Sequence, residues 1–352
     1  CRNVTPKDCA IRIADAFAQL ARIPGCQRYL KLDSTLRGNI GAAIEAATEV
    51  AGAPMLAPAF PARRRTVADG VLLVNGTPVA ETEVGRDGAA PVSVSEVAAI
   101  VRRQWQCGVA ILSPRTYGTP GALAEALAQA LNEGAELLVI DADSAEDMRD
   151  IAAAVQHMSE MSLHVLPAGS AGLARGFADV MGVSPRTPPP SPPARAMPMP
   201  VLAVVGSRTQ VASAQIEALA RAGVQCLPAG DADVAQRAAA MLSAGLAVAI
   251  VPGASDHRVV ARTGAETVAC CGEIGLVLSG GATARRLCEL ARIEHLWIVG
   301  ELQPGVAAGR AVTPEADTMP LVIKGGAAGD AMALVAAIHW IRGEVISAGG
   351  TL

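Results

Sequence analysis

The sequence predicts an α/β protein of two domains, each built on a mostly parallel sheet, because three of its features agree. Apolar segments of strand length alternate with segments whose apolar residues have helical spacing, which is typical of parallel sheets covered by helices on both faces. At 352 residues the chain is too long for one ordinary hydrophobic core. Residues 183–200 carry eight prolines, which prevent helix and central strand and favour an extended linker.

The proline-rich segment sets the predicted domain boundaries. We expect a first domain over residues 1–183, a linker over 184–200 and a second domain over 201–352. In the first domain, the periodicity predicts a helix over 9–22, a strand over 28–33, a helix over 40–52, a strand over 54–61, a hairpin over 71–80, a strand over 109–114, a helix over 120–133, a strand over 136–142, a helix over 144–158, a strand over 163–168 and a helix over 171–181. The hairpin rests on Asn75-Gly76, a pair that accepts positive φ at both residues.

The second domain repeats the alternation of strands and helices. The pattern predicts a strand over 201–207, a helix over 209–222, strands over 224–229 and 246–252 with a helix over 233–244 between them, a strand over 275–281, a helix over 282–293, strands over 295–302 and 320–326, and a helix over 328–343. The stretch before the strand at 275–281 is short, and we expect little room there for a full helix. Pro304-Gly305-Val306 and Gly309 indicate either a loop that closes over the site or a plain turn.

Composition excludes several classes of protein. The net charge is −4 and only eight aromatic residues are available to stack on bases, so nucleic acid is a poor partner. No apolar run approaches the roughly 20 residues that span a bilayer, so we expect no membrane partner. The eight cysteines form no C-x-x-C pair and the five histidines lack metal-ligand spacing. We therefore expect reduced thiols, a cytoplasmic location and no metal held by the protein itself.

The first candidate site follows the strand at 28–33, at the edge where open α/β sheets bind ligands. A helix N-terminus and two cations would favour an anion there, an arginine can hold a carboxylate by two hydrogen bonds, and the other polar groups could bind sugar hydroxyls. The predicted substrate-binding residues are Lys31, Asp33, Ser34, Thr35, Arg37 and Asn39. This set would suit a small hydroxy acid. The alternative is that Ser34 or Thr35 only caps the helix and the charges are solvated.

Two further groups of residues could contribute to binding. Arg63, Arg64 and Arg65 follow the strand at 54–61 and could add to an anionic pocket, although a charge run is usually a solvated face. In the second domain, three glycine-rich turns each follow an apolar strand, at 206–210, 279–283 and 324–330. Glycines let the backbone approach phosphate oxygens, so three such turns at one sheet edge would cradle a nucleotide. Each turn alone often means only a tight connection.

At this point the motifs resemble a known family. KLDSTLRGN (31–39), APAFPARRRTVADGVLLVNGTPVAETE (57–83), the proline-rich linker, SGGAT (279–283) and PLVIKGG (320–326) occur in the order found in the four-carbon acid sugar kinase family. The resemblance covers nearly the whole chain. It implies an N-terminal domain that binds the sugar acid, a C-terminal domain that binds ATP, and an active site in the cleft between them. It also implies phosphorylation of a terminal hydroxyl of threonate, erythronate or a 3-oxo-tetronate.

The resemblance implies roles for individual residues. Lys31, Asp33 and Ser34 would line the sugar-acid site, and Asp33 is our candidate for orienting or deprotonating the acceptor hydroxyl, unless it only accepts backbone hydrogen bonds. The nucleotide, with Mg²⁺ carried on its phosphates, would be bound by Ser207, Gly280, Gly281, Ala282, Thr283, Gly325 and Gly326.

The sequence departs from the family pattern in two respects. The usual opening strand with a D-D-x-T-G turn is missing, so we expect a trimmed chain that opens inside the first domain. Ala282 and the 324–329 turn replace the family's G-G-[DE]-T and K-S-G-x-F-G, and loss of the carboxylate would weaken the positioning of Mg²⁺.

Two other functions compete with the kinase. A non-catalytic protein that binds a nucleotide or a sugar acid remains an alternative, motivated by Ala282 and by the missing opening segment. A nicotinamide-dependent oxidoreductase needs a complete dinucleotide fingerprint, which the chain does not show. The sequence leaves open which acid is used and whether the chain forms a homodimer.

Overall fold

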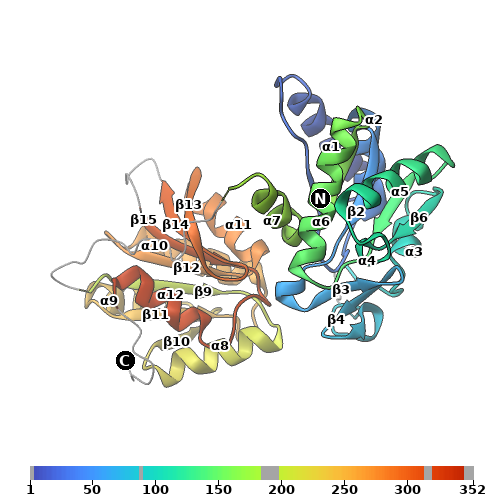
Figure 1. Cartoon of the computed structure of the whole chain (residues 1–352). Coiled ribbons are helices and arrows are strands. Elements are labelled where there is room, and N and C mark those ends of the chain that lie inside the picture. The colour runs from blue at the N-terminus through green and yellow to red at the C-terminus, as the bar shows by residue number, and fades with distance from the viewer. Residues whose placement is uncertain (1–3, 87–89, 184–197, 313–318, 345–352) are drawn as a thin grey trace. The chain divides into compact units, whose positions relative to one another are not determined.

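The computed structural model describes residues 4–86, 90–183, 198–312 and 319–344, and it confirms the α/β class (Figure 1). The chain divides into two compact units, which we call the N-terminal unit (Cys1–Ser184) and the C-terminal unit (Pro185–Leu352). The predicted linker over 184–200 lies outside the described residues up to position 197. Each unit is described by itself.

The N-terminal unit is built on a five-stranded parallel sheet with the order β1-β8-β2-β7-β6. Its strands are β1 (Leu30–Lys31), β2 (Ala53–Ala57), β6 (Val109–Leu112), β7 (Leu137–Ile140) and β8 (Val165–Gly169). The residues of β7 are buried throughout, as expected of a parallel strand covered on both faces. Because β8 lies between β1 and β2, the carboxyl ends of these three strands meet at one edge.

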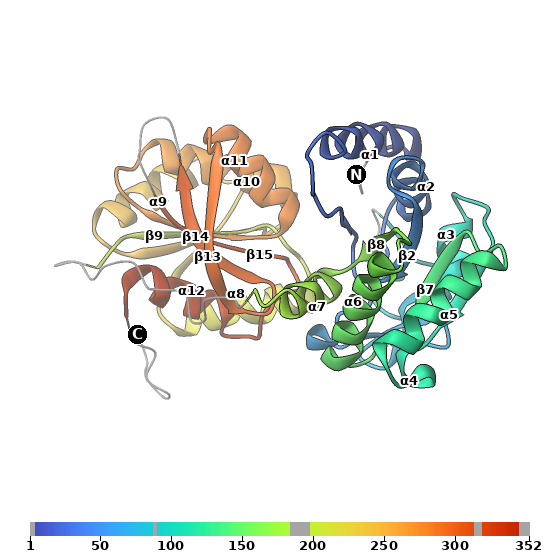
Figure 2. The same cartoon turned by 45° about the horizontal axis from the view of Figure 1, so that its top comes forward.

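Helices of the N-terminal unit form two groups according to their contacts. In one group α1 packs on α2 and α2 on α3; in the other α4 and α5 pack on α6 and α6 packs on α7 (Figure 2). The helices are α1 (Pro6–Leu20), α2 (Ile40–Ala51), α3 (Val97–Arg102), α4 (Pro114–Tyr117), α5 (Pro120–Asn132), α6 (Ala145–Glu160) and α7 (Ala171–Val180). Ser144 and Asp147 form a capping box that begins α6.

The predicted hairpin is confirmed as part of a separate antiparallel sheet with the order β3-β4-β5. It comprises β3 (Arg65–Ala68), β4 (Val71–Val74) and β5 (Thr77–Pro78), flanked by the short helices η1 (Pro61–Arg63) and η2 (Val79–Glu81). Asn75 and Gly76 have φ of 53° and 81°, as the turn requires. The carboxylate of Asp141, just beyond β7, accepts hydrogen bonds from the amides of Asp69 and Gly70 and fastens this sheet to the larger one.

The C-terminal unit contains a seven-stranded sheet with the order β10-β11-β9-β12-β15-β14-β13. The first five strands are parallel, and the last two pair antiparallel. The strands are β9 (Val201–Val205), β10 (Gln225–Pro228), β11 (Ala247–Val251), β12 (Gly275–Ser279), β13 (His295–Gln303), β14 (Val306–Val312) and β15 (Met319–Lys324).

Helices cover the seven-stranded sheet in two groups. Helices α8 and α12 contact one another, while α10 contacts both α9 and α11. Their bounds are α8 (Gln210–Arg221), α9 (Val234–Ser243), α10 (His257–Ala269), α11 (Gly281–Leu290) and α12 (Ala333–Arg342). Each group packs on its own hydrophobic cluster, one containing Leu219 and Ile338 and the other Leu242 and Leu287.

One expectation about this unit was wrong. The stretch before β12 holds the complete 13-residue helix α10, because the carboxylate of Asp256 accepts the amides of Arg258 and Val259 and begins the helix directly after the preceding turn. Of the two alternatives for Pro304 to Gly309, the structure has the plain turn: a hairpin turn at 304–305 leads into strand β14, which contains Gly309. The small residues of β14 hide the alternation of apolar and polar side chains that is typical of a strand.

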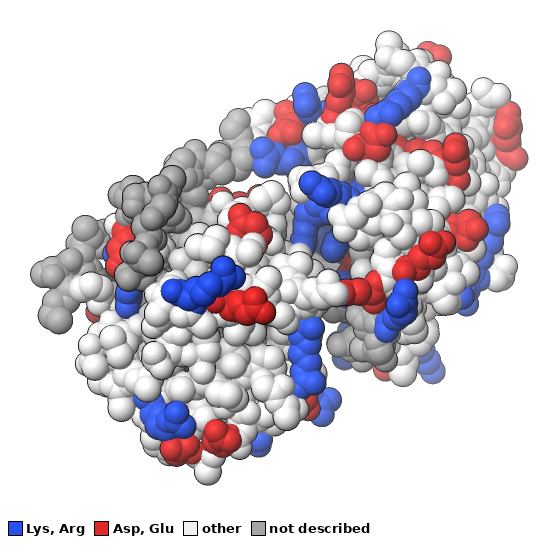
Figure 3. All heavy atoms as spheres, turned by 90° about the horizontal axis from the view of Figure 1, so that it is seen from below, with Lys and Arg blue, Asp and Glu red and all other residues white. Residues whose placement is uncertain are grey.

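None of the helices in the described ranges has the length and apolarity needed to cross a membrane. On the face drawn in Figure 3, basic and acidic side chains are interspersed between uncharged surface.

Candidate functional site

The loop from Lys31 to Asn39 leaves the carboxyl end of β1 and enters α2. The amide of Leu32 donates to the carbonyl of Gly169 (2.7 Å), so the loop starts beside the end of β8. Leu36, which is buried, has φ of 54°, a left-handed conformation that a leucine adopts only under constraint. Strain of this kind concentrates at functional sites. Here Leu36 lies between Thr35 and Arg37, both of which bond to Asp33.

Asp33 is the centre of a hydrogen-bond network within this loop. Its Oδ1 accepts from the amide (2.8 Å) and hydroxyl (2.5 Å) of Thr35, and its Oδ2 forms an ion pair with Arg37 (2.9 Å). Burial raises the pKa of Asp33, but the Arg37 charge and the Thr35 hydrogen bonds outweigh burial and lower the pKa to about 2. The carboxylate is therefore ionised at neutral pH, a weak base, and the fixed partner of Thr35 and Arg37.

Arg65 joins this loop although it lies 31 positions away from Ser34 in the chain. Its Nη1 donates to the hydroxyl of Ser34, which is itself buried. The run of three arginines was predicted only as a general addition to the site. The structure separates them: Arg65 reaches the loop, Arg64 is exposed, and Arg63 is half-buried. No signal in the sequence distinguishes the three.

Lys31 and Asn39 lie at the two ends of the loop. Lys31 Nζ donates to the carbonyl of Leu32 (2.6 Å), and burial lowers the pKa of its ammonium. The Asn39 amide donates to the carbonyl of Val4 (2.7 Å) and accepts from Gln104 (3.2 Å). Asn39 thus connects the loop to the residues just before α1 and just after α3. A hollow of about 340 Å³ beside the loop is lined by Ile13, Leu30, Lys31, Leu32, Asp33, Arg37, Asn39, Ile40 and Ala43.

Positive charge exceeds negative charge in this cluster. The carboxylate of Asp33 is paired with Arg37 and also attracts Lys31 and Arg65. The charges of Lys31 and Arg65 repel one another. Three cations against one carboxylate leave a surplus of positive charge. Arg37 and Arg65 are half-buried, where an anion binds more strongly than in water, and Lys31 is exposed at the rim. Of the predicted residues, Lys31, Asp33, Arg37 and Asn39 line the hollow, whereas Ser34 and Thr35 are buried behind it. The charges at the hollow suit a carboxylate ligand.

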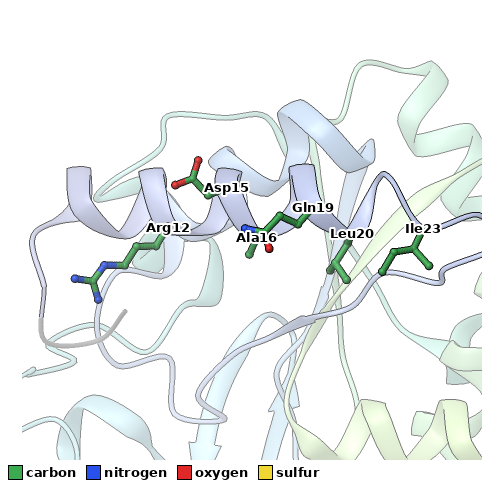
Figure 4. A pocket seen from close by; sticks show the side chains of 6 residues that line it. All are labelled: Arg12, Asp15, Ala16, Gln19, Leu20 and Ile23. Atoms are coloured by element: carbon green, nitrogen blue, oxygen red, sulfur yellow. The ribbon is translucent and has the colours of Figure 1, made fainter.

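A second hollow in the N-terminal unit, of about 540 Å³, lies along α1 (Figure 4). Its lining comes from α1 and the turn after it and comprises Arg12, Asp15, Ala16, Gln19, Leu20 and Ile23. Arg12 and Asp15 are exposed, so this surface offers no desolvated charge cluster comparable with the loop after β1.

Replacing Asp33 by asparagine should lower stability in a pH-dependent way. Because folding lowers the pKa of Asp33 from 3.8 to about 2, the carboxylate stabilises the folded state above pH 3.8, and this stabilisation is lost as the pH falls toward 2. The melting temperature of Asp33→Asn should be below that of the wild type at about pH 6, and the gap should narrow below about pH 4. The exposed Asp15→Asn is the control; a gap for Asp33→Asn that is independent of pH would contradict the network.

In the C-terminal unit, the three glycine-rich turns follow β9, β12 and β15, which are neighbours in the sheet. All three strands are parallel, so the turns meet at one edge. The connection from β9 leads toward β10, and that from β12 leads the other way, toward β13. This is a topological switch point, where open α/β sheets have the crevice that binds ligands.

Lys324 ties two of these turns together. It is only 2% exposed, and its Nζ donates to the hydroxyl of Ser279 (3.0 Å) and the carbonyl of Gly326 (3.3 Å). The amide of Gly280 donates to the carbonyl of Lys324 (3.0 Å). A buried ammonium thus lies directly beneath the turns. Sequence reasoning placed Lys324 in a glycine turn but did not select it as a binding residue.

The predicted nucleotide-binding residues occupy this edge. Ser207 lies against Gly326, where an added Cβ would overlap the Ser207 hydroxyl, and the Thr209 hydroxyl donates to the Gly326 carbonyl (3.2 Å). Gly280 has φ of 103° and precedes the first turn of α11, whose N–H groups face outward from the strand end. At the start of α11, Gly281 and Ala282 are exposed, whereas Thr283 is buried against β9.

The arrangement fits a nucleoside triphosphate. Glycine turns, a helix N-terminus and a buried cation are the groups that hold phosphate oxygens. Within the described parts of the chain there is no group of three His, Cys, Asp or Glu side chains able to hold a metal ion.

Comparisons with known proteins match both units. Residues 1–177 match the family model described as a sugar-binding N-terminal domain, and residues 247–334 match that of a nucleotide-binding C-terminal domain. A D-threonate kinase of Cupriavidus necator is 30% identical over 95% of this chain and 84% of its own. A D-erythronate kinase of Heliobacterium modesticaldum is 27% identical over 98% of this chain and 86% of its own.

A solved structure shows the same fold. A Salmonella typhimurium protein superposes with a TM-score of 0.73 at 21% identity and covers 96% of this chain and 86% of that chain.

Proposed function

Because the chain belongs to the four-carbon acid sugar kinase family, we propose that it transfers the terminal phosphoryl group of ATP to a terminal hydroxyl of threonate, erythronate or a 3-oxo-tetronate. That it is a kinase of four-carbon sugar acids follows from relatives of about 30% identity along most of the chain. The choice of acid and of hydroxyl is our proposal. The observation that supports an acid as the substrate is the surplus of positive charge, from Lys31, Arg37 and Arg65, beside Ser34.

In the proposed complex the loop after β1 binds the acid. Its cations would face the carboxylate, and the hydroxyl of Ser34 would bind a hydroxyl of a short sugar chain. Thr35 is fully buried, and its hydroxyl would hold Asp33 in place. Asp33 remains a predicted catalytic residue. Its pKa of about 2 favours a positioning role, in which it orients Arg37 and Thr35, over that of a general base.

The turns after β9, β12 and β15 bind ATP in this proposal. Ser207, Gly280, Gly281, Thr283, Gly325 and Gly326 would surround the phosphates, with Lys324 beneath them. Bound ATP supplies the phosphoryl group, and Mg²⁺ carried on its phosphates neutralises charge. Ala282 offers no carboxylate to assist that ion. The protein residues contribute positioning and electrostatic stabilisation.

We include a cytoplasmic location in the proposal, since ATP is available there and the eight cysteines form no C-x-x-C pair. A homodimer stays a prediction.

The test is ADP release by the purified chain with ATP, Mg²⁺ and a panel of D- and L-threonate, erythronate and 3-oxo-tetronates. We expect turnover with one or two of these acids and none with the corresponding sugar alcohols. Calorimetry on the same sample separates the alternative function. Binding of an acid and of ATP without turnover would replace the kinase by a non-catalytic binding protein.

A further inference from the structure

We propose that Arg65 is the residue that anchors the carboxylate of the sugar acid. The proposal rests on the function proposed above and assigns its acid-binding role to an arginine from the β3 strand, in addition to the loop after β1. The Ser34–Arg65 contact brings it to the site.

The backbone around Arg65 is built to hold its side chain at the end of the sheet. The amide of Phe60 donates to the carbonyl of Arg65 (2.7 Å), and the amide of Arg65 donates back to the carbonyl of Phe60 (3.2 Å). Between them, η1 ends at Arg63, and the next residue, Arg64, has φ of 50° and reverses the chain. The guanidinium is thereby placed beside Ser34 by a closed turn rather than by a flexible arm.

The two arginines at the site have different partners. Arg37 is paired with Asp33, and the remaining oxygen of that carboxylate accepts both hydrogen bonds of Thr35. Arg65 donates instead to a neutral hydroxyl through Nη1. A guanidinium carries five N–H donors in a planar fork, which matches a carboxylate by two parallel hydrogen bonds. Arg37 lines the hollow beside the loop, but Asp33 already engages its guanidinium. Arg65, whose guanidinium donates to a hydroxyl, is therefore the arginine that we assign to an incoming carboxylate.

The electrostatic surroundings of Arg65 agree with this assignment. Burial and the neighbouring charge of Arg63 lower the pKa of Arg65 to about 10, so the guanidinium is charged at neutral pH but less favourably than in water. Binding an anion would relieve this repulsion. Ser34, already hydrogen-bonded to Arg65, would be free to rotate its hydroxyl toward the sugar.

A purely structural role for Arg65, tying the hairpin to the loop, makes different predictions. Three variants separate the two roles: Arg65→Met, which keeps the aliphatic stem, Arg65→Lys, which keeps the charge, and the exposed neighbour Arg64→Met as matched control. For each we would measure the melting temperature, ATP affinity by calorimetry, and affinity for the sugar acid that the wild type binds best.

For Arg65→Met we expect acid affinity to fall roughly 10- to 100-fold, the range for a charged hydrogen-bonded contact, with ATP affinity and melting temperature close to those of Arg64→Met. Arg65→Lys should recover part of the loss.

Acid affinity of Arg65→Met equal to the wild type would overturn the proposal. A lower melting temperature together with weaker ATP binding in both Arg65 variants would indicate a structural role and would also overturn it. A wild-type chain that binds none of the acids would overturn it as well. Acid binding that depends on Arg65 but occurs without turnover would refute the kinase function and leave the anchor in place.

Discussion

Replacement of Lys324 by methionine is expected to lower kcat/KM for ATP by roughly 100-fold or more. Its ammonium joins Ser279, at the end of β12, to the Gly326 carbonyl in the turn after β15. Methionine keeps the length of the stem but removes every donor, so the two turns lose their connection and the phosphates lose a buried cation. Such a cation acts in surroundings of low dielectric constant, where it interacts strongly with phosphate charge.

The chain offers a matched control because it has only three lysines, Lys7, Lys31 and Lys324. Lys7 is exposed on α1, and Lys7→Met should leave ATP turnover unchanged. Lys324→Arg retains the charge but not the size, and we expect it to recover less than a tenth of the activity, since an amino group and a guanidinium are not interchangeable in a closed space. ATP affinity of Lys324→Met within twofold of the wild type would refute this role.

Gly206→Ala is expected to destabilise the C-terminal unit by about 1–3 kcal/mol and to weaken ATP binding. A Cβ at this position would overlap the hydroxyl oxygen of Thr283 and lie 2.9 Å from its Cβ. Thr283 is 1% exposed, so it has no room to move aside. The overlap would push the first turn of α11 away from β9 and open the switch point.

Chemical denaturation followed by circular dichroism, together with calorimetric titration of ATP, measures both effects. Gly272→Ala is the control, because its Cβ would meet no atom within 4 Å and its φ is not positive. A Gly206→Ala chain with wild-type stability and ATP affinity would show that the close packing of β9 against α11 does not shape the site.

The local pattern of the chain predicted most elements. Apolar periodicity located the strands and helices that hold the site, and Asn75-Gly76 identified its hairpin. The pattern missed α10, whose start depends on the side chain of Asp256, and β14, whose small residues lack a clear alternation. The element is set by hydrogen bonds in both cases: the helix by its cap and the strand by its two neighbouring strands. The pattern of apolar residues does not show these hydrogen bonds.

The sequence by itself determined the α/β class, the candidate anion site in the loop after β1 and the glycine-rich turns, because these depend on residues close together in the chain. Only the tertiary structure placed Arg65 beside Ser34 and Lys324 beside Ser279, pairs that are 31 and 45 positions apart. Strand order and a left-handed turn at Arg64 bring these side chains together. These contacts join residues far apart in the chain, so no pattern of neighbouring residues reveals which arginine or lysine reaches the site.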